Sequence, residues 1–427
     1  MFKAVAGYYK DNERLRLLVK IIAVWLISRA VMLLMVPVMN LIADEPHQWL
    51  YYMNPWDAEW YKGIVENGYQ PPKSSGMASW AFFPLYPLVC MAVRLVTMGS
   101  IDTYAVGMTV SNICIIIAVY YAVKYADIEL DMKKYNKKTV EDIIIFLMLA
   151  GPFAVYYGAM YTEALFILCV ILCFYNSARH NYMAAASATR IVGCMLVFVL
   201  ITYMFMETCA ECRAKHNSEM KDNKEAGIID KCMLTEEAGI LIAGNISLAS
   251  VIRTFIKNVI KEPKKLVAIM ISPLGIFIYM NYLRYFCGDS WAFYHVQRAW
   301  RTQKMFPVIG VLFKSCTGQL SAASGVKTLN GIILGWLCVI TLMLYAAMIR
   351  KKHYALGIFG IIVLLIPLTS SVMSTLRFIM GSFVIYIGVA EIIAGCNRYV
   401  RYGIITLLSI VEIVVISAWY FWDGLLM

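Results

Sequence analysis

The side chains best suited to acid–base chemistry lie in one aromatic stretch, NPWDAEWYKGIVENGYQPP, at residues 54–72. Asp57, Tyr61 and Ile64 recur at helical spacing and therefore share one face of the helix predicted here. Glu59 points to a different face of that helix. A carboxylate on an apolar, aromatic face is poorly placed for mere solvation, so Asp57 is a candidate proton acceptor.

A structural interpretation of Asp57 is equally open. Asn54 followed by Pro55 is typical of a helix N-cap and a first helical residue. Asp57 would then stand three residues after the cap, where its carboxylate can reach back to the backbone N–H of Asn54. The residues alone do not choose between capping and chemistry.

Aromatic rings surround this carboxylate along the chain. Rings beside carboxylates suit a sugar, because its C–H faces stack on rings while its hydroxyl groups need acceptors. The same rings would also gather at a membrane interface without any ligand. The side chains that a sugar site would use here are Trp56, Glu59, Trp60, Tyr61, Tyr69 and Phe83.

A second aromatic stretch, YFCGDSWAFYHVQRAWRTQKMFP at residues 285–307, supplies His295, Gln297 and Arg298 as further candidates. His295, Arg298 and Arg301 stand three residues apart and line one helical face with groups that pair with phosphate. The alternative is that the basic residues of this stretch bind lipid headgroups at the membrane surface.

Isolated charges beside apolar runs are a third group of candidates. Arg190 and Arg377 each stand alone between such runs, and an arginine at membrane depth is costly unless it faces a cavity or a partner. Glu163 begins an apolar run, where it could serve a site or stabilise the N-terminal end of a helix dipole. Arg29, inside the first apolar run, is expected to pair with Glu163 or with another carboxylate.

The composition indicates what holds these residues. Of 427 residues, 61% are hydrophobic and only 15% are charged, whereas soluble domains carry about 25% charged residues. The apolar residues come in blocks of about 20, the length that crosses a bilayer. We therefore predict an all-α polytopic membrane protein that forms a single domain over residues 1–427. The predicted full spans, about nine, are 21–42, 103–123, 141–160, 162–178, 266–286, 328–349, 353–371, 377–396 and 402–421.

The charge and the cysteines exclude some functions. The net charge of +11 does not indicate a nucleic-acid partner, because basic residues of membrane proteins gather in cytoplasmic loops. Most of the 12 cysteines lie inside apolar runs, with a single CxxC spacing at Cys209 and Cys212. Neither a disulfide framework nor a metal site is expected.

The basic residues orient the spans. One set of loops holds 26 of the 38 Lys and Arg residues and is expected to be cytoplasmic. This set is 1–20, 123–139, 179–181, 207–265, 350–352 and 397–401. Residues 43–100, a large loop with interfacial helices, and residues 287–327 then lie outside. Within the inner loop 207–265, residues 239–252 are expected to lie at the interface against anionic lipid.

This orientation constrains the path of residues 182–206 through the membrane. Both flanking loops are assigned to the cytoplasm, so this segment must enter the membrane and return as a short hairpin. Its 25 residues are too few for two full crossings at about 1.5 Å per residue. The alternative is one ordinary span, which would place the basic loop 207–265 outside.

Several of these stretches together resemble one family. WDAEWYKGIVENGY and AFFPLYPLV resemble the signature of the PIG-V mannosyltransferases and their bacterial relatives, within the GT-C superfamily of glycosyltransferases. The resemblance continues, in the same order, through YTEALF, TRIVG, GDSWAFYHVQRAW and STLRF. These six segments are residues 56–69, 81–89, 161–166, 189–193, 288–300 and 374–378. Val65, Ser290 and Trp291 depart from the residues usual in the family.

The resemblance implies an inverting glycosyltransferase of GT-C-like fold. It would move mannose or another hexose from a polyprenyl-phosphate donor to a lipid-linked or glycan acceptor at the non-cytoplasmic face, with no further cofactor. Asp57 would be the general base, with Arg190, His295 or Arg377 at the phosphate. The membrane would be a bacterial plasma membrane with an outward-facing site, or the endoplasmic reticulum with a lumenal site.

A transporter or flippase of lipid-linked sugars is the alternative. It predicts ionisable groups near the midplane of several spans and two related halves of the chain. In this sequence the ionisable groups gather toward one face, and no two halves match.

Overall fold

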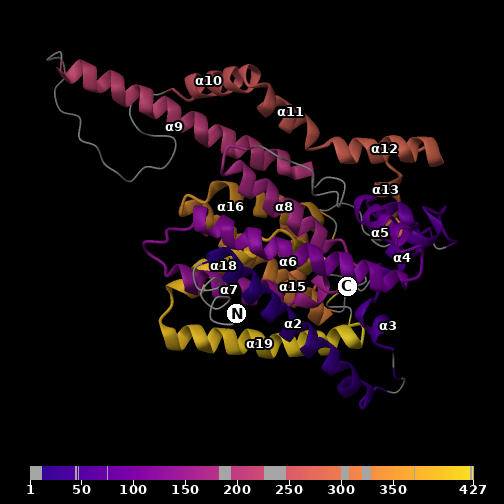
Figure 1. Ribbon diagram of the computed structural model, residues 1–427. Coiled ribbons are helices and arrows are strands. Elements are labelled where there is room, and N and C mark those ends of the chain that lie inside the picture. Colours follow the sequence, from indigo (N-terminus) through magenta and orange to yellow (C-terminus); the bar gives the residue numbers. More distant parts are fainter. Residues whose placement is uncertain are drawn as a thin grey trace.

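The computed structural model describes residues 12–43, 46, 48–74, 76–181, 194–225, 247–299, 307–319, 328–369, 371–423 and 426. Over these residues the chain is helical, without a strand. Several of its helices are long and apolar, as in an integral membrane protein. In Figure 1, helices α9 to α12 run along one side of the helical bundle and α19 along the opposite side. Helices α4, α5 and α13 gather at one end.

Four helices have the length and composition of a membrane span. They are α2 (Glu13–Asn40), α6 (Thr103–Glu129), α15 (Thr328–Arg350) and α19 (Arg398–Tyr420). Two helix pairs pass the same test only when each pair is taken together across its bend. These are α11 (Pro263–Ile271) with α12 (Leu274–Cys287), bent by 42°, and α17 (Thr375–Gly381) with α18 (Val384–Gly395), bent by 70°.

The other helices are shorter, more polar, or both. They are α3 (Trp49–Met53), α4 (Asp57–Asn67), η1 (Ser79–Ala81), α5 (Leu85–Val96), α7 (Lys137–Leu149), η2 (Ala154–Tyr157), α8 (Glu163–Ser177), α9 (Leu196–Glu225), α10 (Leu248–Lys261), α13 (Ala292–His295), η4 (Val296–Ala299), α14 (Val308–Cys316) and α16 (Tyr354–Leu368). Counting each bent pair as one, the described residues contain up to six span-length helices. The prediction of nine full spans is therefore not confirmed.

The run predicted as a span over residues 141–160 shows why some helices are shorter than the predicted spans. Helix α7 ends at Leu149, and Pro152 stands in the irregular segment that follows, where its ring removes one backbone donor. This segment is almost wholly buried, so its polar groups need partners inside the protein. Side chains from distant helices supply them: Glu412 accepts from the N–H of Phe153 at 3.1 Å, and Arg29 donates to the carbonyl of Ala154 at 3.3 Å.

Of the predicted partners of Arg29, Glu163 is not paired with it among the described residues, whereas another carboxylate, Glu412, interacts with its charge. The Nε of Arg29 donates to Asn112 Oδ1 at 2.8 Å, and the guanidinium lies against Gly158. The arginine inside the first span thus supports the irregular backbone, which in turn leads into helix α8.

The segment between α8 and α11 is described in part. Helix α9 runs without interruption from apolar to charged sequence, and α10 packs against it through the rings of Phe205 and Phe255. Residues 182–193 lie outside the described residues, and so does most of the predicted interfacial segment 239–252. The hairpin over residues 182–206 remains a prediction.

Candidate active site

The candidate base stands at a sharp turn of the backbone. Helix α3 ends at Met53, and helix α4 begins at Asp57 itself, directly after Trp56, whose φ of 48° lies in the left-handed region. A non-glycine residue in this region costs on the order of 1–3 kcal/mol and persists only where surrounding contacts impose it. The turn places the Asp57 carboxylate at the very start of the helix.

The predicted cap at Asn54 is wrong. Its side chain donates to the carbonyl of Leu50 at 2.7 Å and accepts from the backbone N–H of Met160, also at 2.7 Å. Among the described residues no side chain caps α4. Asn54 instead ties the turn before α4 to the irregular segment before α8. Asp57 is therefore not part of a capping box with Asn54.

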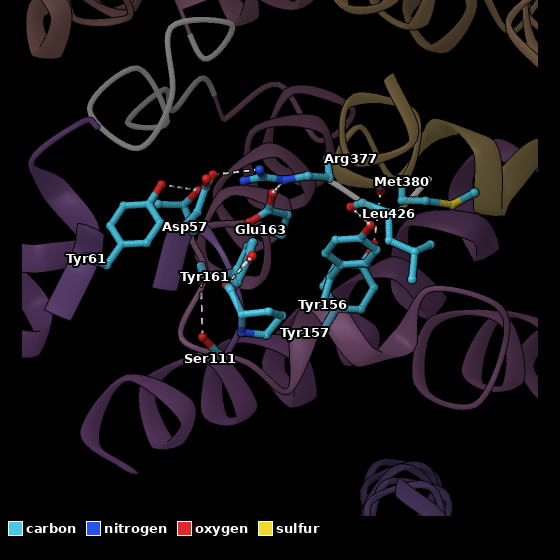
Figure 2. Close-up of polar contacts among 12 residues, drawn as sticks. Asp57, Tyr61, Ser111, Tyr156, Tyr157, Tyr161, Glu163, Arg377, Met380 and Leu426 are labelled. Atoms are coloured by element: carbon cyan, nitrogen blue, oxygen red, sulfur yellow. Dashed lines mark hydrogen bonds and ion pairs between the residues drawn. The ribbon is translucent and has the colours of Figure 1, made fainter. Parts of the chain in front are cut away.

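Arg377 joins Asp57 to a second carboxylate (Figure 2). Its Nη1 donates to Asp57 Oδ2 at 2.6 Å and its Nε donates to Glu163 Oε1 at 2.7 Å. The guanidinium also lies 5.0 Å from the ring centre of Tyr161, a distance typical of a cation–π contact. We refer to Asp57, Arg377 and Glu163 as the Arg377 cluster.

Burial differs within the Arg377 cluster. The side chain of Glu163 is 1% exposed, that of Arg377 9% and that of Asp57 24%. A buried charge needs a partner, so the ion pair keeps the side chains of Glu163 and Arg377 in place. Asp57 is the group that a substrate can reach, and a buried cation stands directly beside it.

Two tyrosines hold the segments of the Arg377 cluster together. The hydroxyl of Tyr161 donates to the carbonyl of Pro55 at 2.7 Å, and that of Tyr61 donates to Thr162 Oγ1 at 3.3 Å. Burial, and then the nearby carboxylates of Asp57 and Glu163, raises the pKa of Tyr61 well above its usual value. Tyr61 is therefore a neutral hydroxyl beside the candidate base.

Arg377 reaches this position through a second strained turn. Helix α17 begins after Ser374, whose φ of 63° is left-handed, and it ends seven residues later at the bend into α18. A straight helix through the predicted span 377–396 would have carried Arg377 at its terminus. The bend of 70° instead separates α17 as a short buried helix that aims the guanidinium at α4 and α8.

The match to a protein family adds evidence to the geometry of this site. The family model described as Mannosyltransferase (PIG-V) matches residues 15–300. The chain belongs to the PIG-V mannosyltransferase family. It is therefore a glycosyltransferase of the membrane. No curated protein and no solved structure matches the chain.

The matched range includes two members of the Arg377 cluster. Asp57 and Glu163 lie within residues 15–300, whereas Arg377 lies beyond them. Arg377 is brought to the other two only by folding, across 320 residues from Asp57 and 214 residues from Glu163.

The predicted aromatic residues of this PIG-V family chain lie around helix α4 in two groups. Trp56 packs edge-on against Trp419, with ring centres 5.3 Å apart. Trp60 stacks on Phe82, with ring centres 5.7 Å apart. Tyr69 donates to the carbonyl of Phe82 at 2.6 Å, and Phe83 packs with Tyr279 and Phe293 in a separate apolar cluster. Glu59 is exposed.

The second predicted group of binding residues is not brought to the Arg377 cluster. His295 Nδ1 lies 2.6 Å from Asp289 Oδ2, and this hydrogen bond lowers the pKa of Asp289. Among the described residues, His295, Gln297 and Arg298 make no contact with the Arg377 cluster. Their loop packs on η1 instead, through its aromatic side chains. Arg190 lies outside the described residues.

The sequence analysis missed the aromatic residues at the end of α19. Trp419 is fully buried beneath Trp56, and Trp422 lies 6.0 Å from the same ring. Nearby, the hydroxyl of Tyr156 donates to the carbonyl of Leu426 (Figure 2). The aromatic run ISAWYFWDG was a signal for this packing, but it was assigned to a plain span at residues 402–421.

Within the described part of the chain, no three His, Cys, Asp or Glu side chains form a group that could hold a metal ion. The groups that this site presents are its carboxylates, its guanidinium and its tyrosine hydroxyls.

Proposed function

We propose that the protein transfers a mannosyl or related hexosyl group from a polyprenyl-phosphate donor to a hydroxyl group of a lipid-linked or glycan acceptor. The reaction inverts the anomeric carbon and takes place at the non-cytoplasmic face of the membrane. The observation that carries this proposal is the ion pair of Asp57 and Arg377, an accessible carboxylate beside a buried cation.

Asp57 serves as the general base of the proposed reaction. The acceptor hydroxyl attacks the anomeric carbon while its proton passes to the Asp57 carboxylate. The bond from the anomeric carbon to the phosphate oxygen breaks, and its electron pair leaves with the phosphate. An anomeric phosphate is already a fair leaving group, so the reaction needs no carboxylic acid to protonate it.

Glu163 supports an inverting transfer over a glycosidase. Glycosidases place two carboxyl groups about 5–10 Å apart on either side of the bond that they cleave. Here the second carboxylate is 1% exposed and is bound to Arg377, so it cannot act on a sugar. A single accessible carboxylate fits a reaction in which the acceptor itself is the nucleophile.

Arg377 stabilises the charge that develops on the leaving phosphate. A guanidinium pairs with phosphate oxygens through parallel N–H groups, and its effect is largest where protein excludes water. Arg377 is buried and lies within hydrogen-bond distance of the base. Because inversion requires attack from the face opposite the leaving group, the base and the phosphate would stand on opposite faces of the anomeric carbon.

The surroundings of the site support the proposed donor and membrane side. Apolar helices of span length are part of the bundle, which suits a donor carried on a polyprenyl chain. The distribution of basic residues supports an outer position for helix α4, and nucleotide sugars are cytoplasmic compounds. The transporter alternative has no support from the family match, which is to a transferase.

Asp57→Asn tests the proposal. The variant keeps the size of the side chain but removes its basicity, so transfer from polyprenyl-phosphate mannose should fall by roughly 10²–10⁴. The assay uses the purified enzyme, with a nucleotide sugar as the comparison donor, and it includes thermal unfolding.

Asp102→Asn is the matched control. Asp102 caps helix α6 by accepting from the backbone N–H of Tyr104 at 2.8 Å, so its replacement tests a capping role and leaves the site intact. It should retain most of its turnover. Near-normal transfer by a well-folded Asp57→Asn variant would disprove the assignment of the base, and preference for the nucleotide sugar would disprove the assignment of the donor.

A further inference from the structure

The guanidinium of Arg377 is shared unequally among its neighbours. Its Nε is bound to Glu163 and its Nη1 to Asp57. Among the residues that the structure describes, its Nη2 has no hydrogen-bond partner. A planar guanidinium has five N–H groups in a fixed arrangement, so fixing Nε also fixes the direction of both terminal nitrogens. Glu163 thereby decides where Nη1 and Nη2 point.

Within the Arg377 cluster one guanidinium serves two carboxylates, and burial prevents water from screening them fully. The phosphate of a donor would bring a third anion to the same guanidinium. Nη2 can meet a first phosphate oxygen directly, but the parallel pair of contacts that arginine makes with phosphate also requires Nη1, which must then leave Asp57.

We infer that Glu163 is a positioning residue, which holds Arg377 by Nε while the terminal nitrogens pass from Asp57 to the donor phosphate. This inference rests on the proposed function. Glu163 is the more deeply buried partner and stays in place, whereas Asp57 is the accessible one. Before the donor binds, Arg377 neutralises the base; once the donor is bound, Arg377 faces the phosphate and the base is free.

The chemical step completes this exchange. The acceptor hydroxyl loses its proton to Asp57, which becomes neutral, and the oxygen forms a bond to the anomeric carbon. The phosphate leaves with the electron pair of the broken bond and gains one negative charge. The negative charge therefore moves from Asp57 to the phosphate, so the contact of Arg377 with the phosphate strengthens at the moment when its contact with Asp57 weakens.

Glu163→Gln tests the role of Glu163, since the amide keeps the size but removes the charge that holds Nε. Arg377 should then remain on Asp57 and meet the phosphate less well, so kcat/KM for the donor should fall roughly 10-fold to 100-fold, through a lower kcat and a higher KM. With one negative charge removed beside Asp57, the acid limb of the kcat profile should move to lower pH. The other ionisable groups facing the Arg377 cluster, the hydroxyls of Tyr61, Tyr156 and Tyr161, remain unchanged.

The controls separate positioning from stability. Glu163→Asp keeps the charge and should restore the wild-type position of the acid limb. Glu391→Gln removes another buried carboxylate, which is 6% exposed and lies far along the chain in α18. It should lower the melting temperature and leave the pH profile of the folded enzyme unchanged.

Two outcomes would overturn the inference. One is a Glu163→Gln variant with wild-type kcat and an unmoved acid limb. The other is a Glu163→Gln variant in which only the fraction of folded enzyme decreases, while kcat per folded enzyme is unchanged. A purely structural role would give that result. If Asp57→Asn abolishes transfer while Glu163→Gln behaves as wild type, the positioning role is wrong and the proposed function stands. If Asp57→Asn transfers normally, the proposed function is wrong as well.

Discussion

A second cation stands between two carboxylates elsewhere in the molecule, and it differs from the Arg377 cluster in a useful way. His353 lies in the turn between α15 and α16, with its Nδ1 2.8 Å from Glu129 Oε1 and its Nε2 3.9 Å from Glu391 Oε2. The distribution of basic residues predicts that this turn faces the cytoplasm, opposite the Arg377 cluster. We refer to these three residues as the His353 cluster.

The carboxylates of the His353 cluster have additional partners. Lys351 lies 3.0 Å from Glu391, and the hydroxyl of Tyr135 donates to the same carboxylate at 3.1 Å. The hydroxyl of Tyr125 donates to Glu129 at 2.9 Å. Two cations thus face two carboxylates, with hydroxyl groups completing the hydrogen bonds. Such a network is satisfied, and we interpret it as structural.

The Arg377 cluster has one cation for two carboxylates, and its most exposed member is a carboxylate. The side chains of the His353 cluster are 6% to 15% exposed, whereas that of Asp57 is 24% exposed. Ion pairs of similar geometry can therefore serve different purposes. The His353 cluster ties helices together, and we propose that the Arg377 cluster presents a carboxylate and a cation to a substrate.

Arg377→Lys should show the largest effect. Lysine keeps the charge but replaces the planar fork of separate nitrogens by one ammonium, so it cannot keep the contacts with Glu163 and Asp57 and also offer parallel N–H groups to a phosphate. We expect kcat/KM for transfer to fall about 10²–10⁴-fold. The melting temperature should also fall, because a buried carboxylate loses a partner. Transfer kinetics and thermal unfolding of the purified variant measure both effects.

The matched change on the other side of the molecule is Lys351→Gln, which removes a cation from Glu391. It should leave turnover unchanged and lower the melting temperature slightly, since Lys351 is half-exposed and the pair is screened by water. If Lys351→Gln lowered turnover as much as Arg377→Lys, the two clusters would not differ in purpose.

The stability of the protein should depend on pH through the His353 cluster. Burial alone would lower the pKa of His353, but its hydrogen bonds to Glu129 and Glu391 outweigh this and raise the pKa to about 9. A raised pKa in the folded state stabilises the fold fully below about pH 6.5, the usual pKa of histidine. That stabilisation is lost as the pH rises through 9.

A melting temperature measured between pH 6 and pH 10 should therefore fall more in the wild type than in His353→Gln. The variant cannot gain or lose this proton, so the difference between the two curves isolates His353. Lys351, Tyr125, Tyr135 and Tyr203 face the same carboxylates and are common to both proteins. Parallel curves for the two proteins would contradict the assignment of a charged histidine.

The smallest expected effects compare one hydroxyl in each cluster. Tyr161→Phe removes the hydrogen bond to Pro55, and Tyr135→Phe removes the one to Glu391. Each should cost about 0.5–1.5 kcal/mol of unfolding free energy. Only Tyr161→Phe should also lower kcat, by a few-fold, because Pro55 stands two residues before Asp57. Equal turnover in both variants would show that the position of the turn before α4 does not limit catalysis.

Much of this protein is determined by local sequence. The apolar blocks predict a helical membrane protein, because a backbone in lipid must satisfy its own hydrogen bonds. The stretch around Asp57 identifies the candidate base and the family together. Arg377 and Glu163 stood out as charges beside apolar runs, where an unpaired charge is too costly to keep. Each of these inferences depends on residues that are close together in the chain.

The tertiary structure alone decided which charges meet and where helices stop. Arg377 lies 320 residues from Asp57, and no local pattern relates them. The break after Leu149 and the loss of the Asn54 cap have one cause: side chains from other helices bind the irregular backbone more favourably than local capping would. The predicted span count and the predicted cap were both inferred from local patterns. The hydrogen-bond partners of buried polar groups are the residues that the fold brings near them. Spacing along the chain does not reveal these partners.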